Sequence, residues 1–182
     1  MKKTITLLCV VLFISVVLIQ NCESPFSDKS SGDQGFFRLL LKDAPLDLND
    51  VDAVYVTVSE IAVRKASSDN YIVVLDELTE FELLELKDNP QPIVETYLEE
   101  GHYTGIRFMV ESARIIVDGV ENELNVPSNK IIVNVEFEVT EDSTIKLTLD
   151  FDAENSIEVV EAGQSGIYIL RPVIQVDDIS YN

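Results

Sequence analysis

The chain has 182 residues, of which 46% are hydrophobic and 25% charged, a composition typical of one globular domain with short appendages. Thirteen Lys and Arg residues against 33 Asp and Glu residues leave a formal net charge of −20. Such a charge repels phosphate backbones, so we expect no nucleic-acid partner. Two cysteines and one histidine, His102, are too few for a cysteine-rich zinc site, a disulfide framework or a histidine cluster that binds metal.

The first 21 residues have the features of an export signal. Lys2 and Lys3 precede an apolar run from Ile5 to Ile19. That run is shorter than the roughly 20 residues of a membrane-spanning helix, but it suits the hydrophobic part of a secretory signal. An uncleaved anchor and an ordinary secretory signal are the alternatives, although Ile19-Gln20-Asn21 lacks the small residues of an ordinary cleavage site.

Cys22 directly follows this segment, and the arrangement resembles the lipobox of bacterial lipoproteins. Leu18 and Ile19 match its aliphatic positions, whereas Asn21 stands where Gly, Ala or Ser is usual. The resemblance implies that Cys22 is diacylated, with palmitate or a similar chain, and becomes the first mature residue. Two or more acyl chains hold a protein stably at a membrane.

Lipidation has consequences for location and chemistry. We expect an exported protein anchored to the bacterial cell envelope, and Glu23 after the cysteine favours the outer membrane or the cell surface. Processing would remove Cys9 and block Cys22, so thiol catalysis and disulfides are excluded in the mature chain. The lipidated cysteine and the Ser- and Asp-rich segment 22–34 form a flexible tether, and 35–182 forms the domain.

The first half of the domain begins with two predicted strands. Phe36–Leu41 is the first, and Val54–Val58 alternates apolar and polar residues. The apolar phase then moves by one residue to Ile61 and Val63, which predicts a bulge or bend near Ser59-Glu60.

The middle of the chain contains the clearest turn. Tyr71–Leu75 predicts a strand, whereas Glu80–Leu86 suits either a strand or one helical turn. Ile106–Val110 follows with an apolar inward face. Asp118-Gly119 separates two further β runs and predicts a hairpin with a two-residue loop, which would pair Arg114 with Glu123.

Two alternating segments follow, 131–139 and 145–151. Their odd-numbered residues are apolar and their even-numbered ones mostly polar, with Glu136 and Glu138 on the polar side. We predict that they form an antiparallel hairpin in which Val139 faces Ile145 and Glu138 lies beside Lys146.

Ile167–Val176 is apolar on both faces for much of its length and predicts a central strand despite Pro172. Strands at spacings of about ten residues predict an all-β fold. We expect one antiparallel β-sandwich, immunoglobulin-like or transthyretin-like, with seven to nine strands and at most one short helix.

An ordered set of segments resembles the bacterial and archaeal exported family known as domain of unknown function 4382. The segments are Leu41–Pro45, Val54–Val58, Phe81–Leu86, Gly101–Arg107, Val117–Val120, Leu149–Ala153 and Leu170–Val173. The resemblance covers nearly all of the chain from Gly35 to Val176. It implies an exported or lipid-anchored β-sandwich and supplies no catalytic residues.

One acidic segment has the spacing of a calcium loop. Its positions 1, 3, 5, 7, 9 and 12 are Asp150, Asp152, Glu154, Ser156, Glu158 and Glu161. The alternative interpretation is a solvated acidic strand end, since a calcium loop of this type lies between helices and 33 acids produce such spacing by chance. Asp150, Asp152, Glu154 and Glu161 are the predicted metal ligands, and no other cofactor is expected.

The remaining polar residues predict no catalytic site. His102 lies at the entry to a strand without a Ser-His-Asp or Cys-His pattern. Arg38, Arg107, Arg114 and Arg171 are scarce cations, and Arg171 is predicted to pair with an acid or to stack on Tyr168.

The sequence favours a lipid-anchored extracytoplasmic β-sandwich with a binding or structural role and no catalytic activity. Its expected partners are the membrane, through Cys22, and a protein or glycan. The alternatives are a calcium-dependent binding module that uses Asp150–Glu161 and a hydrolase that uses a pair of carboxylates.

Overall fold

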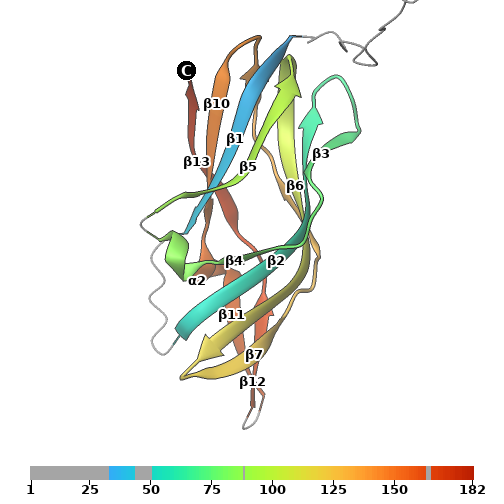
Figure 1. Cartoon of the computed structure of the whole chain (residues 1–182). Helices are drawn as coiled ribbons and strands as arrows, with labels where there is room; N and C mark the ends of the chain where they lie inside the picture. Colours follow the sequence, from blue (N-terminus) through green and yellow to red (C-terminus); the bar gives the residue numbers. More distant parts are fainter. Residues whose placement is uncertain (1–32, 44–50, 88, 163–164) are drawn as a thin grey trace, which may run out of the picture. The chain divides into compact units, whose positions relative to one another are not determined.

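Alternation of apolar and polar residues decides which side of each strand faces the interior of this protein. A computed structural model describes residues 33–43, 51–87, 89–162 and 165–182 (Figure 1). Within these ranges the chain forms thirteen strands in two sheets, a single turn of 3₁₀ helix and one short α-helix. The two sheets pack as a sandwich around one hydrophobic core. In the described part of the chain, no helix has the length and apolar character needed to cross a membrane.

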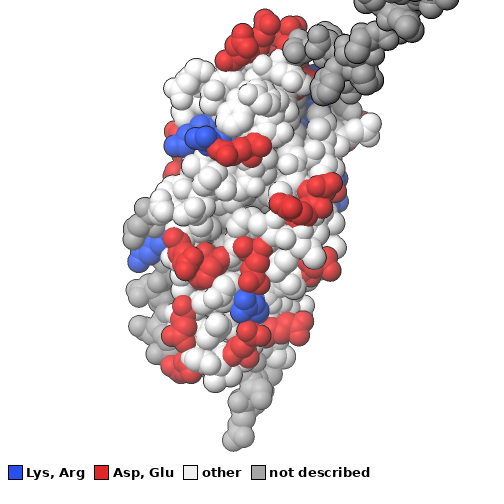
Figure 2. Space-filling view, viewed as in Figure 1, with Lys and Arg blue, Asp and Glu red and all other residues white. Residues whose placement is uncertain are grey.

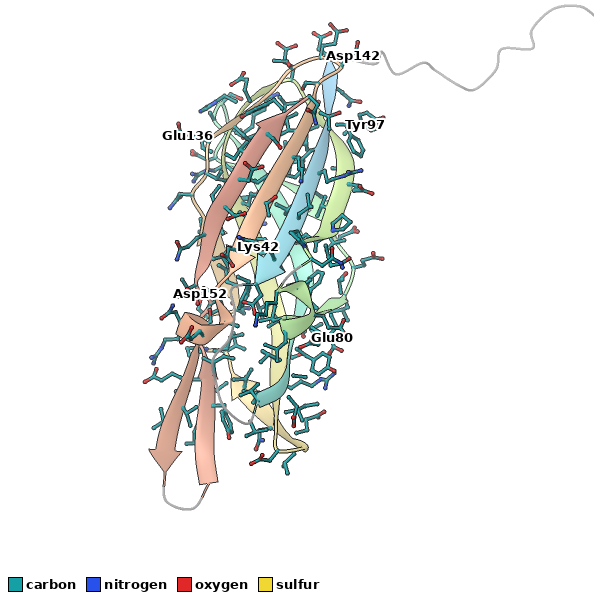
Figure 3. The ribbon with its side chains drawn as sticks, turned by 90° about the vertical axis from the view of Figure 1, so that its left-hand side faces the viewer. Lys42, Glu80, Tyr97, Glu136, Asp142 and Asp152 are labelled. Carbon is teal, nitrogen blue, oxygen red and sulfur yellow. The ribbon has the colours of Figure 1, made fainter. Side chains whose placement is uncertain are left out.

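The smaller sheet has four strands in the order β13-β10-β1-β5. They are β1 (Gln34–Asp43), β5 (Gln91–Glu99), β10 (Thr144–Phe151) and β13 (Ile174–Tyr181). β1 pairs with β10 in parallel and with β5 antiparallel. Figure 1 shows β1, β10 and β13 side by side, and Asp142 and Asp152 mark the two ends of β10 in Figure 3.

The larger sheet has nine strands, with β2 and β6 at its centre. They are β2 (Val51–Lys65), β3 (Tyr71–Leu75), β4 (Thr79–Glu82), β6 (Gly101–Val117), β7 (Val120–Asn125), β8 (Lys130–Val133), β9 (Phe137–Val139), β11 (Ile157–Ala162) and β12 (Ser165–Leu170). β3 and β4 both pair with β2, and β7, β8 and β9 all pair with β6. The two helices are η1 (Leu84–Leu86) and α2 (Ala153–Ser156).

The prediction of an all-β sandwich with one short helix is confirmed. The described strands number thirteen rather than seven to nine, because the long strands β2 and β6 each pair with several short ones and β11–β12 adds a hairpin. The sheets are also mixed, since β1–β10 and β7–β12 are parallel while the other ladders are antiparallel. The finer distinction between an immunoglobulin-like and a transthyretin-like sandwich stays a prediction.

Three local predictions between residues 54 and 126 are confirmed. The β2 register shifts between Thr57 and Glu60, where the change of apolar phase predicted a bulge. Asp118 and Gly119 both have positive φ, 50° and 73°, and connect β6 to β7 in the predicted hairpin. The ambiguous segment 80–86 divides into both predicted forms, because β4 ends at Glu82 and η1 follows.

The predicted hairpin between 131–139 and 145–151 is wrong in its pairing. β8 and β9 pair with β6 in the larger sheet, whereas β10 pairs with β1 and β13 in the smaller one. The faces are nevertheless as predicted, since Phe137 and Leu147 are buried and Glu136 and Glu138 are exposed. A turn at Thr140–Ser143 carries the chain across the sandwich, so the two apolar faces oppose each other instead of lying side by side. Glu138 therefore lies beside His102 rather than Lys146.

The predicted central strand 167–176 is also wrong. The chain leaves the larger sheet after Leu170 and enters the smaller sheet at Ile174, where β13 is an edge strand. Pro172 lies in this break, and it has no backbone N–H to donate to a ladder. The apolar character on both faces arises because this segment belongs to two sheets in turn.

Three stacked aromatic rings join the sheets in the core. The Phe137 ring lies between Phe37 of the smaller sheet and Tyr103 of the larger, with centroid distances of 5.2 and 5.1 Å. All three side chains are buried. The Tyr103 hydroxyl donates to the Glu99 carbonyl at 2.9 Å. Burial, with a contribution from the nearby Glu99 carboxylate, raises the pKa of Tyr103 to about 12.

Replacing Phe137 tests whether this contact holds the sheets together. Phe137→Ala removes the middle ring of the stack and leaves a cavity, so we expect the free energy of unfolding to fall by about 3–5 kcal/mol. Glu136→Ala, one residue away and exposed, is the control and should change it by less than about 0.5 kcal/mol. Urea denaturation measures both, and a loss below about 1 kcal/mol for Phe137→Ala would contradict the packing described here.

Candidate functional site

The acidic segment after β10 forms a hydrogen-bonded junction between the sandwich and the β11–β12 hairpin. Asp152 is the N-cap of α2. Its Oδ1 accepts from the Asn155 backbone N–H at 3.0 Å, and its Oδ2 accepts from the Asn155 side-chain amide at 2.7 Å. Oδ1 therefore caps the backbone at the helix start, which is a normal use of aspartate at this position, and Oδ2 binds the Asn155 side chain.

Ser156 lies at the centre of the junction and is 1% exposed. Its hydroxyl donates to the Asp152 carbonyl at 2.5 Å and accepts from the Val173 N–H at 2.8 Å. The Ser156 carbonyl accepts from the Arg171 N–H at 2.7 Å, and the Asp152 N–H donates to the Val173 carbonyl at 3.0 Å. These bonds hold the break between β12 and β13 against the end of β10.

Asp43 ties the same junction to the end of β1. Its side chain is 2% exposed, and its Oδ1 accepts from the Ala153 N–H at 3.0 Å. The hydrogen bond satisfies one of the N–H groups at the start of α2 that have no partner within the helix. Because Asp43 and Ala153 are 110 residues apart, the contact forms only when β1 and β10 lie in register.

Lys42 bridges two carboxylates on the other side of the β1 end (Figure 3). Its Nζ lies 2.7 Å from Asp177 Oδ1 and 3.7 Å from Asp150 Oδ2. The hydrogen bond to Asp177 raises the pKa of Lys42, with Asp150 adding to the effect. Burial raises the pKa of Asp150, and Lys42 only partly opposes that change.

This arrangement bears on the predicted calcium ligands. Asp150 faces Lys42 and Asp152 caps α2, while Glu154 is exposed and the Glu161 side chain lies outside the described residues. The segment is flanked by a strand and a four-residue helix, whereas a calcium loop of this type lies between two helices. Among the described side chains, no three His, Cys, Asp or Glu groups lie close enough to hold a metal ion. Calcium binding stays a prediction.

Most of the arginines neutralise acids of the same chain. Arg114 stacks over Tyr55 at 3.7 Å and binds Glu80 and Glu121 at 2.9 and 3.0 Å. Arg114 and Glu123 are register partners as predicted, but the ion pair is with Glu121. Figure 2 shows the few basic side chains on the visible face next to acidic ones.

The other singled-out cations follow the same rule. Arg107 stacks over Tyr71 at 4.2 Å and binds Glu60 at 2.6 Å, and Arg38 binds Glu95 at 2.6 Å. Arg171 pairs with Glu158. Of the two predicted roles of Arg171, pairing with an acid is therefore confirmed. His102 is exposed, and its Nδ1 lies 3.1 Å from Glu138 Oε2.

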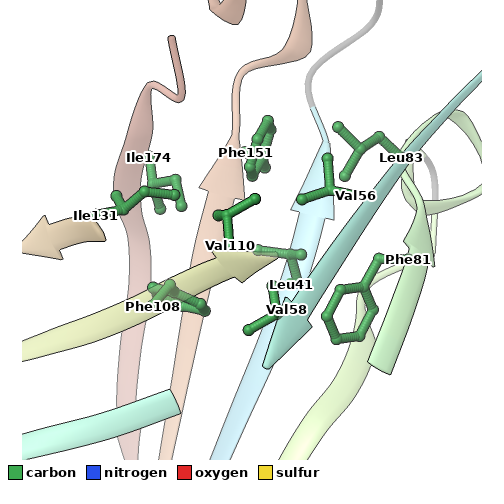
Figure 4. Close-up of a pocket in the computed structure, with 10 residues that line it drawn as sticks. All are labelled: Leu41, Val56, Val58, Phe81, Leu83, Phe108, Val110, Ile131, Phe151 and Ile174. Carbon is green, nitrogen blue, oxygen red and sulfur yellow. The ribbon is translucent and has the colours of Figure 1, made fainter. Parts of the chain in front are cut away.

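The core contains a small apolar cavity between the two sheets (Figure 4). Its volume is about 10 Å³, and it is lined only by apolar side chains, among them Leu41, Phe108 and Phe151. Such a space is barely large enough for one water molecule and supplies no polar partner for it. The cavity is therefore a packing feature and too small for a substrate.

A larger groove of about 640 Å³ lies between β6, β7 and β12. Polar residues contribute more of its lining than apolar ones, and they include Glu111, Ser112, Asn122 and Glu123. The sequence indicated no groove here and named Glu123 only as the hairpin partner of Arg114, since two glutamates among 33 acids give no signal of a binding site. Its size is in the range of ligand sites, and it is open to solvent.

Ser156→Ala tests the junction. The substitution leaves the Val173 N–H without its acceptor, and we expect the free energy of unfolding to fall by about 1–3 kcal/mol. Ser128→Ala is the matched control, because the Ser128 hydroxyl is exposed and donates only to the Lys130 carbonyl. Thermal and urea denaturation of both variants give the comparison, and equal small losses would show that the junction hydrogen bonds do not matter.

The raised pKa of Asp150 predicts a pH dependence. The folded state binds this proton more tightly than the unfolded state, so the Asp150 contribution to stability falls as the pH rises through its pKa. Asp150→Asn lacks that fall, and its stability relative to wild type should be higher at pH 7 than at pH 3. Urea denaturation at both values tests this, with the exposed Glu136→Gln as a charge-removal control. A relative stability that is the same at both values would be evidence against the raised pKa.

Comparison with known proteins identifies the family. No curated protein and no solved structure matches the chain at a significant level. A family model described as "Domain of unknown function (DUF4382)" matches residues 34–172. The match begins with β1 and ends in the break after β12, so it includes the junction around α2 but not β13. It extends over more than half of the sequence, and the chain therefore belongs to the DUF4382 family.

Proposed function

We propose that this protein is a lipid-anchored, extracytoplasmic binding module of a bacterial cell envelope and has no catalytic activity. The anchor is Cys22, and the β-sandwich is held at a distance from the membrane by the tether that follows. The observation that carries the proposal is the position of Cys22 directly after an export-type apolar segment. The cysteine itself lies outside the described residues.

The topology of the domain agrees with presentation on a tether. The chain enters the domain at Gln34, whose carbonyl accepts from the Asp142 N–H at 3.0 Å. β1 and β10 are parallel, so both strands end at the opposite side, where α2 and the β11–β12 hairpin follow. At about 3.3 Å per residue, the ten residues of β1 separate these ends by roughly 33 Å. The hairpin end is thus remote from the point of attachment.

A binding role fits the chemistry of the described side chains better than catalysis. Asp43, which is buried, and Asp150, which is half-buried, serve the fold, the first as an acceptor for α2 and the second as a partner of Lys42. His102 faces a carboxylate rather than a nucleophile. An open polar groove between strands suits recognition of a partner surface.

Replacement of the two cysteines tests the anchor. In a bacterial host with lipoprotein processing, we expect the wild-type chain in the membrane fraction, with a mature N-terminus at diacylated Cys22 by mass spectrometry. Cys22→Ala should abolish both acylation and cleavage of the precursor at this position, because the lipid acceptor is lost. Cys9→Ala is the matched control and should behave as wild type. An intact Met1 or a free Glu23 terminus on the wild-type chain would refute the anchor.

A further inference from the structure

Beside the groove, the neighbouring strands β7 and β12 of the larger sheet are paired over only part of their length. β12 pairs with β7 only at Tyr168–Leu124 and Ile169–Asn125. From Val120 to Glu123, β7 pairs with β6 on one edge, and no described strand pairs with its other edge. An exposed strand edge presents N–H and C=O groups that an extended segment can bind.

The rim of this open edge is apolar in places. Val120, at the start of β7, is 60% exposed, and Ile167 of β12 is 48% exposed. Apolar side chains of this size on a free edge favour contact with another chain over contact with water.

The charge of the groove indicates the charge of the segment that it can bind. Glu111 and Glu123 line it, both are exposed, and neither forms an ion pair with a described residue. The nearest arginine in sequence, Arg114, is already bound to Glu80 and Glu121. No lysine, arginine or histidine is among the groove's lining residues. The groove therefore attracts cations and repels anions.

A second copy of this protein is a poor occupant for the same reason. Each chain carries a formal net charge of −20, and acidic side chains outnumber basic ones on the face seen in Figure 2. Two such surfaces repel each other unless the contact supplies basic residues. The complementary occupant is a different chain that carries lysine or arginine.

We propose that the groove binds an extended segment of a basic partner protein, which pairs with the free edge of β7 at Val120–Glu123. Apolar side chains of the segment contact the rim residues, and lysine or arginine side chains reach Glu111 and Glu123. This inference rests on the binding role proposed above and names its surface and the class of its partner. β7 and β12, which contribute lining residues to the groove, lie at the hairpin end of the domain, away from the start of β1 (Figure 1).

A defined peptide tests the proposal on the full chain in detergent. The probe is a fluorescein-labelled, eight-residue peptide of alternating valine and lysine, and fluorescence anisotropy measures its Kd. We expect saturable binding that weakens as salt is added, and binding at least tenfold weaker when glutamate replaces every lysine. Absence of binding by the lysine peptide, or equal binding of both peptides, would overturn the proposal.

Paired variants separate the groove from the general acidity of the protein. Glu111→Gln with Glu123→Gln should weaken binding about tenfold, as expected for two exposed ion pairs. Glu136→Gln with Glu141→Gln removes the same charge from exposed positions near the opposite end of β10 and should leave Kd within twofold. Equal losses in both pairs would show nonspecific attraction and contradict a groove. Melting temperatures verify that all variants fold.

Strand pairing has its own readout. A lysine peptide N-methylated at alternate residues keeps its charge but cannot donate hydrogen bonds along one edge, and it should bind at least tenfold more weakly. Hydrogen exchange should slow at Val120–Glu123 when the unmodified peptide is bound. Unchanged binding after methylation, or protection elsewhere only, would refute pairing with β7. None of these measurements depends on acylation of Cys22, so failure of the anchor and failure of the groove remain distinguishable.

Discussion

The contact between the two inner sheet faces is the constraint on which the rest of the structure depends. Phe137 stacks between Phe37 and Tyr103, so one ring from the smaller sheet and two from the larger share a single column. The apolar residues of β10 pack into the same core. Burial of these faces is the main driving force for folding in a domain with this composition. The polar features, including the junction at α2 and the groove beside β7, are positioned by that packing.

The junction shows how packing places polar groups. Asp43 ends β1 and Ala153 begins α2, and the parallel β1–β10 register brings them within hydrogen-bonding distance. Ser156 then fixes the break between β12 and β13 by accepting from Val173. Two of the four predicted calcium ligands contact other groups of the fold, since Asp152 caps the start of α2 and Asp150 faces Lys42. Asp43 and Asp152 accept hydrogen bonds from backbone N–H groups, and Asp150 and Asp177 face Lys42.

The sequence predicted strand faces well and strand partners poorly, and alternation explains both. Phe137 and Leu147 are buried while Glu136 and Glu138 are exposed, as the two-residue period indicates. The same period is satisfied whether two successive strands are neighbours in one sheet or face each other across the core. A short turn at Thr140–Ser143 allows either arrangement, and the structure takes the second. The Asp118-Gly119 hairpin was predictable because its two-residue loop leaves only one pairing.

The groove could not be predicted for a related reason. Glu111 and Glu123 are two of many acids that form no ion pair with a described residue, and only their position in the groove sets them apart, since Arg114 reaches Glu80 on β4 and Glu121 on β7 instead. The described residues include ten lysines and arginines and a much larger number of acids. The positions of these ten cations therefore decide where negative charge remains uncompensated. On β7 that charge coincides with an edge that no described strand pairs with at Val120–Glu123, because β12 and β7 share only two residue pairs. Backbone N–H and C=O groups without a strand partner favour an extended chain, and carboxylates without a cation favour a basic one. Both groups lie at this place only because of the sheet topology, so an alternation pattern along the sequence does not reveal them.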